Sequence, residues 1–107
     1  MMPVVEITQE NYFRVALQNA IGLTVVDFYA PWCGPCRALA PTFEDIANAY
    51  PRVQVLKINV DSLPSVAAAF NVSSLPTILF IRDGAVVDKV VGAKRDEIAH
   101  KLLQYNM

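Results

Sequence analysis

The segment Trp32-Cys33-Gly34-Pro35-Cys36 contains both cysteines of the chain, with two residues between them. A disulfide stabilises a protein mainly by closing a long loop of the unfolded chain, and a bond at this spacing closes a very short one. In a reducing compartment, a close cysteine pair is more often catalytic or metal-binding than structural. The spacing therefore predicts a dithiol that is reversibly oxidised.

A metal site is the alternative use of two such cysteines. Zinc usually takes four ligands, and the one other candidate, His100, is far away in the sequence. The apolar spacing of Ile98 and Leu102 places His100 on the opposite side of the last predicted helix. We therefore expect redox chemistry at the cysteines and a solvent-exposed histidine.

The dithiol lies between a predicted strand and a predicted helix. The β-branched and aromatic run 23–29 predicts a strand, and apolar residues at helical intervals from Leu39 to Tyr50 predict a helix that begins at the second half of the motif. The free N–H groups and positive dipole end of a helix N-terminus favour a thiolate. We expect Cys33 to be the nucleophile and Cys36, one turn further in and less accessible, to be the resolving cysteine.

Asp27 is a carboxylate inside the apolar strand 23–29. Burial disfavours the charged form, so the pKa of this carboxyl should be raised and the group could exchange a proton near neutral pH. The alternative is a structural ion pair with Lys57 from the strand expected beside it.

The other elements alternate along the chain. Strands are expected over 4–7, 53–60, 77–81 and 86–91, and helices around 13–20, after 61–62 and around 98–105. Asp61 or Ser62 would cap the third helix, with Val66, Ala69 and Phe70 pointing inward. Asp83-Gly84 between two apolar runs predicts a hairpin and hence antiparallel strands.

Length and charge restrict the classes of protein. The 107 residues, 54% of them hydrophobic, are enough for one core, so we expect a single domain over 1–107. Nine basic and ten acidic residues give a net charge of −1, which disfavours nucleic acid or an anionic membrane as the main partner. Neither a signal peptide nor a membrane span is visible, so a cytoplasmic location is expected.

The whole chain resembles the thioredoxin family. The landmarks are Trp32-Cys33-Gly34-Pro35-Cys36, Val26-Asp27-Phe28, Pro41, Lys57-Ile58-Asn59-Val60-Asp61, Leu75-Pro76-Thr77, Gly84 and Val91-Gly92, in the order of that family. Tyr29 and Pro31 depart from the commonest pattern of the family. The resemblance implies an α/β thioredoxin fold, with a central five-stranded mixed sheet flanked by four helices.

The resemblance also implies roles for individual residues. Asp27 would accept the proton of Cys36 while Lys57 moderates its charge, and Gly34-Pro35 between the cysteines is similar to the reducing members of the fold. Pro76 would be cis and would leave the backbone of the preceding residue free to pair with an extended substrate segment. A flat apolar docking surface would be formed by Trp32, Gly34, Pro35, Leu75, Gly92 and Ala93. The indole N–H of Trp32 could also donate to Asp61, unless that carboxylate only caps a helix.

The expected function is that of a protein-disulfide reductase. With four glycines and no GxGxxG motif, the chain has no dinucleotide signature. We therefore expect no bound cofactor and no metal, only a reversible Cys33–Cys36 disulfide that a separate reductase recharges. The family resemblance implies that this reductase is a flavoprotein, thioredoxin reductase, which takes its electrons from NADPH. Disulfide-containing proteins such as peroxiredoxins would be the substrates of a monomeric protein. An oxidase or isomerase of the same fold, and a binding module with an idle dithiol, are the alternatives.

Overall fold

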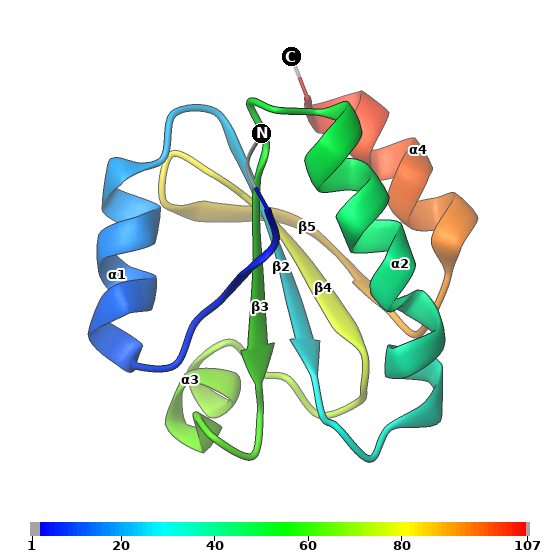
Figure 1. The fold of residues 1–107 in the computed structure, drawn as a ribbon. Coiled ribbons are helices and arrows are strands. Elements are labelled where there is room, and N and C mark those ends of the chain that lie inside the picture. The colour runs from blue at the N-terminus through cyan, green and yellow to red at the C-terminus, as the bar shows by residue number, and fades with distance from the viewer. Residues whose placement is uncertain (1–2, 107) are drawn as a thin grey trace.

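A sheet with helices on both faces forms the molecule, and the structure, a computed structural model, describes residues 3–106 (Figure 1). The elements in chain order are β1 (Val5–Glu6), α1 (Glu10–Asn19), β2 (Leu23–Tyr29), α2 (Gly34–Ala49), β3 (Gln54–Asn59), α3 (Pro64–Ala69), β4 (Thr77–Arg82), β5 (Ala85–Val91) and α4 (Arg95–Tyr105). The first and third strands are shorter at both ends than their apolar runs predict. Pro41 lies inside α2, which continues through it.

The strands follow the order β1-β3-β2-β4-β5. β1 and β2 run parallel to β3, whereas β4 runs antiparallel to both β2 and β5. Within residues 3–106, the mixed five-stranded sheet with its helices confirms the expected fold class. Because β2 is the central strand, its C-terminal end and the cysteines that follow it lie midway across the sheet, at the end where β2 and β3 finish.

Two apolar clusters form the core, one on each face of the sheet. Val25 of β2 packs in a cluster with residues of α2 and α4, whereas Val26 and Phe28 pack in a cluster with residues of α1 and α3. Figure 1 shows the same division, with α1 and α3 on one side of the sheet and α2 and α4 on the other. Because both faces of β2 are covered, its sequence is apolar at nearly every position instead of alternating.

The β4–β5 connection is the tight hairpin that Asp83-Gly84 predicts. Both residues have positive φ, 54° and 77°, and the strands pair from Arg82 and Ala85 outward. Positive φ at both central positions gives a turn whose twist matches that of the flanking strands. The antiparallel orientation of this edge of the sheet follows from that local geometry.

The start of α3 differs from the prediction. Leu63 is the N-cap residue, with no side-chain cap, so neither Asp61 nor Ser62 caps this helix. The helix begins directly at Pro64, whose fixed φ suits the first turn. Within α3, Val66 and Ala67 are buried, whereas Ala69, which the sequence analysis placed inward, is exposed.

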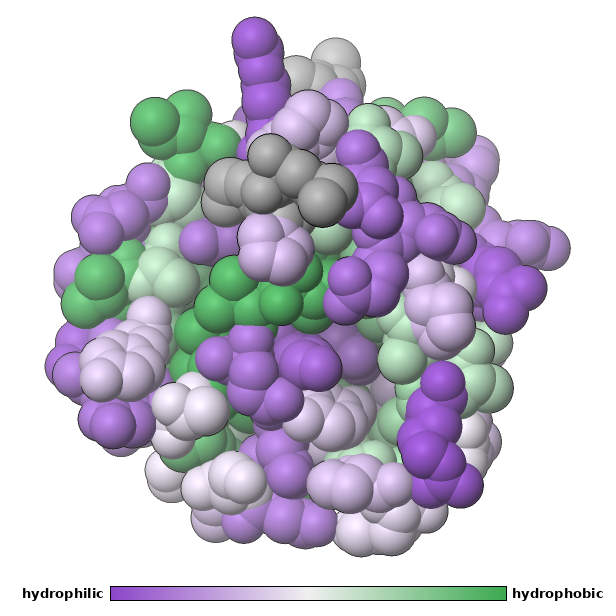
Figure 2. Space-filling view, in the orientation of Figure 1, coloured by the Kyte–Doolittle hydropathy of each residue, from purple (hydrophilic) through white to green (hydrophobic). Residues whose placement is uncertain are grey.

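Hydrophilic and apolar side chains are interspersed over the face of the molecule that Figure 2 shows. The sequence carries nine basic and ten acidic residues, a net charge of −1.

Candidate functional site

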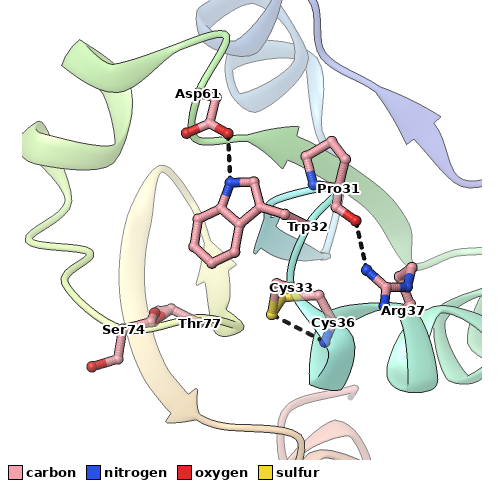
Figure 3. The surroundings of a disulfide bond; sticks show 8 residues. All are labelled: Pro31, Trp32, Cys33, Cys36, Arg37, Asp61, Ser74 and Thr77. Carbon is pink, nitrogen blue, oxygen red and sulfur yellow. Dashed lines mark hydrogen bonds between the residues drawn. A yellow bond between two sulfur atoms is a disulfide. The ribbon is translucent and has the colours of Figure 1, made fainter.

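The cysteine pair lies at the turn from β2 into α2, as the sequence predicts. Cys33 is the N-cap residue of α2, and its backbone N–H donates to the Ala30 carbonyl at 3.1 Å. Cys33 and Cys36 form a disulfide with their Cα atoms 5.3 Å apart (Figure 3). The helix therefore begins between the two cysteines, with Cys33 just before its first residue and Cys36 in its first turn.

The sulfur of Cys33 accepts a hydrogen bond from a backbone N–H group of this first turn. The backbone N–H of Cys36 donates to Cys33 Sγ at 3.2 Å, the contact that a serine or aspartate oxygen makes at an ordinary N-cap. Both cysteines are buried, 6% exposed for Cys33 and 4% for Cys36. Exposure therefore hardly separates the two residues, and the helix contact to Cys33 Sγ is what distinguishes them.

Trp32 lies beside the disulfide and is 68% exposed (Figure 3). Its indole N–H donates to Asp61 Oδ2 at 2.8 Å, so the expected hydrogen bond is present. Because Asp61 is engaged here and does not cap α3, its carboxylate serves to orient the indole. The result is a fixed aromatic surface next to the cysteines.

Arg37 makes a contact that sequence reasoning did not find. Its guanidinium donates from Nη1 to the Pro31 carbonyl at 2.8 Å and so ties the first turn of α2 to the loop before it. No pattern in the sequence distinguishes this rotamer from a solvated one, because the carbonyl becomes available only when the turn has its final shape.

The segment around Leu75-Pro76 lies against the dithiol. The peptide bond between these residues is cis, as expected. The half-buried Leu75 packs against a third, smaller apolar cluster, which consists of Ala30 and both cysteines. The buried Pro76 accepts a hydrogen bond at its carbonyl from the Gly92 N–H, at 2.8 Å. Segments far apart in sequence therefore meet beside the disulfide, with Ala93 exposed next to them.

Asp27 is buried at 5% exposure in the middle of the sheet. Burial raises the pKa of Asp27 to about 7, while the positive charge of Lys57 lowers it and the negative charge of Glu6 adds to the increase. Among the residues that the structure describes, its Oδ1 atom has no hydrogen-bond partner. Such a carboxyl is half-protonated near neutral pH and can both hold and accept a proton.

Among the described residues, Asp27 and Lys57 do not form an ion pair, although the Lys57 charge still lowers the pKa of Asp27. The two residues are register partners on β2 and β3, but Lys57 Nζ pairs with Glu6 Oε1 at 3.8 Å. The Lys57 side chain is 39% exposed. The ammonium group extends outward because β1 places a second carboxylate on its other side.

Glu6 also accepts a hydrogen bond from Tyr29, at 2.7 Å to Oε1 and 2.6 Å to Oε2. Partial burial and this carboxylate raise the pKa of the Tyr29 hydroxyl well above its usual range. Sequence reasoning missed Glu6, because its place opposite Lys57 depends on the order of the strands.

A surface hollow of about 430 Å³ leads to Asp27. Its lining includes Lys57 and three charged residues of α2, namely Arg37, Glu44 and Asp45. The carboxyl is therefore buried in the sheet yet next to a space that admits water, the condition for exchanging a proton with solvent.

The described residues hold no group of three or more His, Cys, Asp and Glu side chains arranged for a metal ion. His100 is exposed on α4, on the side that the sequence predicts. None of the helices within residues 3–106 has the length and apolar composition needed to cross a membrane.

Comparisons with known proteins give consistent results. A family model described as thioredoxin matches residues 3–104. The chain is 46% identical over 93 residues to a thioredoxin H-type of Picea mariana, covering 84% of this chain and 74% of the relative. It is 47% identical over 83 residues to thioredoxin H1 of Arabidopsis thaliana, covering 78% and 73%.

Solved structures show the same similarity across the whole fold. Thioredoxin NaTrxh from Nicotiana alata superposes with a TM-score of 0.95 at 36% identity, covering 99% of this chain and 95% of that one. Mitochondrial thioredoxin 3 from Saccharomyces cerevisiae, in its oxidised form, superposes with a TM-score of 0.88 at 31% identity, covering 94% of each chain.

Proposed function

Because the chain belongs to the thioredoxin family and acts by dithiol–disulfide exchange, we propose that it reduces disulfide bonds of other proteins. In this reaction Cys33 is the nucleophile and Cys36 is the resolving cysteine. The observation that carries these roles is the hydrogen bond from the Cys36 N–H to Cys33 Sγ at the N-terminus of α2. This donor and the helix dipole stabilise negative charge on Cys33.

The reaction has two exchange steps. The Cys33 thiolate attacks one sulfur of the substrate disulfide, whose S–S bond breaks, and the other substrate sulfur leaves as a thiolate. The Cys36 thiolate then attacks Cys33 Sγ and expels the second substrate thiolate. Two electrons pass to the substrate, and the Cys33–Cys36 disulfide remains on the protein.

Asp27 is proposed to accept the proton that Cys36 must lose before the second step. Its pKa of about 7 matches this task at neutral pH. The hollow that Asp27 lines offers room for water to carry the proton. Lys57 would moderate the charge that then develops on the carboxylate.

Substrates would dock on the surface formed by Trp32, Gly34, Pro35, Leu75, Gly92 and Ala93. Trp32 is held by Asp61, and Leu75 packs against the cysteines, so the surface has a fixed shape around the disulfide. The backbone of Leu75 would pair with an extended substrate segment, which favours a broad range of substrates because main chain rather than side chain is recognised.

We propose that the domain comprises residues 1–107, works as a monomer in the reducing cytoplasm, and receives electrons from NADPH through thioredoxin reductase. Peroxiredoxins are proposed among its substrates. A solved structure that is 30% identical to this chain supports the proposal of peroxiredoxin substrates. That structure concerns the thiol resolving mechanism in a yeast mitochondrial 1-Cys peroxiredoxin via glutathione/thioredoxin systems.

A coupled assay tests the function. The chain, NADPH, a thioredoxin reductase and a protein with an accessible disulfide are mixed, and NADPH consumption is followed at 340 nm. We expect consumption that depends on the chain and stops when both cysteines are replaced by serine. No consumption, together with a reduction potential well above the cytosolic poise, would favour an oxidase. A partner bound equally by the double variant would favour a binding module.

A further inference from the structure

Lys57 lies between two carboxylates in one row across the sheet. The register pairs Glu6 of β1 with Lys57 of β3, and Lys57 with Asp27 of β2. Register partners of parallel strands project their side chains from the same face. The ammonium of Lys57 can therefore be attracted by either carboxylate, and its position decides which one it neutralises.

The contacts place the Lys57 ammonium on the Glu6 side of this row, toward the edge strand β1. Lys57 Nζ is 3.8 Å from Glu6 Oε1 and 5.9 Å from the centroid of the Tyr29 ring. Tyr29 holds the Glu6 carboxylate in place through its hydroxyl, at 2.6 and 2.7 Å. Asp27 Oδ1, on the other side of Lys57 in this row, has no hydrogen-bond partner within residues 3–106.

We propose that Glu6 is a positioning residue for the exchange reaction: it holds the Lys57 ammonium away from Asp27, so that the buried carboxyl stays without an ion partner and able to take a proton. This inference rests on the proposed role of Asp27. Glu6 touches neither the cysteines nor the substrate surface in the described contacts and acts only through Lys57 and through its own charge.

A purely stabilising role does not account for this arrangement. The Glu6 and Lys57 side chains are 36% and 39% exposed, and ion pairs between such side chains contribute little to stability. The same ammonium moved against a buried carboxylate would strongly favour its charged form, and a carboxylate that is already charged and paired is a poor proton acceptor.

Three other charged residues line the hollow beside Asp27. The experiment below replaces only one of them, Glu44, and does so as a control. Arg37, Glu44 and Asp45 of α2 line the hollow with Asp27 and Lys57. The Arg37 guanidinium is held by the Pro31 carbonyl. Glu44 provides a matched control, because it is a carboxylate at the same hollow, while the ion pair of Lys57 is with Glu6.

The experiment follows the Asp27 carboxyl by carbon-13 NMR titration in the oxidised protein, where the cysteines do not titrate. In Glu6→Gln, which keeps the shape of the side chain, we expect the pKa of Asp27 to fall by about one unit. Glu44→Gln should cause a clearly smaller shift. An unchanged Asp27 titration in Glu6→Gln, or an equal shift in the two variants, would overturn the proposal.

A double-mutant cycle with Lys57→Met separates positioning from direct charge. If Glu6 acts through Lys57, the shift caused by Glu6→Gln should shrink by at least half when Lys57 is absent. A shift of the same size in both backgrounds would show that Glu6 acts on Asp27 by its charge alone and would refute the positioning role.

The pH profile of the resolving step connects the titration to the reaction. In Glu6→Gln, the acid limb of the single-turnover resolution rate should move to lower pH by the same amount as the Asp27 titration. An acid limb that stays in place while the titration moves would show that Glu6 does not position the reaction. If Asp27→Asn leaves resolution unchanged, the role of Asp27 in the reaction fails and that of Glu6 fails with it, whereas the NMR cycle still decides separately whether Glu6 holds the Lys57 ammonium away from Asp27.

Discussion

At the scale of single residues, Cys33 and Cys36 differ in what their sulfur atoms contact more than in exposure. Both are almost fully buried, and Cys33 Sγ is the one that accepts a helix N–H. Attack by Cys33 therefore depends on its charge state, while resolution depends on how Cys36 loses its proton.

The division of roles can be tested by trapping. Cys36→Ser should accumulate stable mixed disulfides between Cys33 and substrate proteins, because the step that releases them is lost. Cys33→Ser should trap almost none. Non-reducing electrophoresis followed by release with a reductant measures both, and equal trapping by the two variants would refute the assignment.

Asp27→Asn tests the proton acceptor. The amide cannot take the Cys36 proton, so resolution should slow by about 10²–10³ near pH 7, as expected for loss of a general base, while first attack by Cys33 stays largely intact. Single-turnover kinetics with a disulfide substrate separate the two steps. An unchanged resolution rate would remove Asp27 from the reaction.

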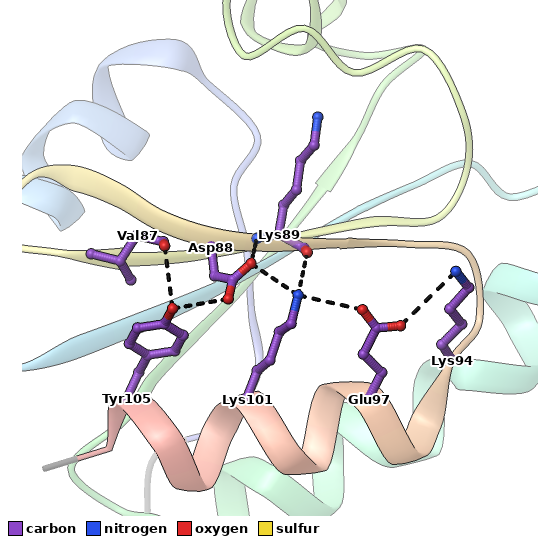
Figure 4. A network of polar contacts seen from close by, with 7 residues as sticks. All are labelled: Val87, Asp88, Lys89, Lys94, Glu97, Lys101 and Tyr105. Carbon is purple, nitrogen blue, oxygen red and sulfur yellow. Dashed lines mark hydrogen bonds and ion pairs between the residues drawn. The ribbon is translucent and has the colours of Figure 1, made fainter.

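At the scale of elements, the N-terminus of α2 donates a backbone N–H to the sulfur of Cys33, and the β4–β5 hairpin forms one edge of the sheet. The turn 30–33, closed by the bond from the Cys33 N–H to the Ala30 carbonyl, leads directly into the first turn of α2, whose Cys36 N–H donates to the sulfur. α4 is fastened to β5 by a polar network, in which Lys101 contacts Asp88 at 2.9 Å and Glu97 at 3.3 Å (Figure 4).

The helix effect predicts an acidic Cys33. In the reduced protein, its thiol should titrate well below the free-thiol pKa of about 8.5, because the Cys36 N–H and the helix dipole favour the thiolate. Alkylation rate against pH gives the value. Cys36→Ser isolates Cys33 for this measurement, and a thiol that titrates at the ordinary pKa would show that the helix has no such effect.

The hairpin predicts a position-specific glycine effect. Gly84→Ala should lower the free energy of unfolding by about 1 kcal/mol, because a φ of +77° strains a residue with a Cβ, although no described atom beyond the two neighbouring residues lies within 4 Å of the added carbon. Gly34→Ala, in the first turn of α2, is the control and should leave stability unchanged or slightly higher. Urea midpoints decide; equal losses in both variants would contradict the strain argument.

At the scale of the whole molecule, Asp27 makes stability depend on pH. Its folded pKa of about 7 lies above the ordinary value of 3.8, so the folded state binds this proton more tightly than the unfolded state. The resulting stability is fully present below pH 3.8 and is lost as pH rises through 7. The full loss is about 4 kcal/mol.

We therefore expect the oxidised protein to become less stable from pH 5 to pH 8 by roughly 2–3 kcal/mol, the part of that loss that falls in this range. Asp27→Asn should flatten this dependence and be the more stable protein at pH 8. Urea unfolding at several pH values measures both. Asp88, whose pKa is lowered by its hydrogen bond to Lys101, acts in the opposite direction and only at acid pH. A wild-type stability that is flat from pH 5 to 8 would contradict the burial argument.

The sequence alone determines the features of the fold that depend only on residues close together in the chain. Apolar spacing locates the strands and helices, and Asp83-Gly84 determines an antiparallel hairpin through its turn geometry. The strand-to-helix turn places Cys33 at a helix N-terminus. Each of these features needs only residues within a few positions of one another.

The tertiary structure alone decides which distant residues meet. β1 joins the sheet beside β3, so Glu6 lies opposite Lys57, 51 positions away, and attracts the ammonium that the sequence analysis considered only as a partner of Asp27. The start of α3 after Leu63, and the bond from Arg37 to the Pro31 carbonyl, likewise depend on the final path of the backbone. The side chains can compete for partners only after the strands are ordered, and that order depends on the burial of both faces of the sheet at once.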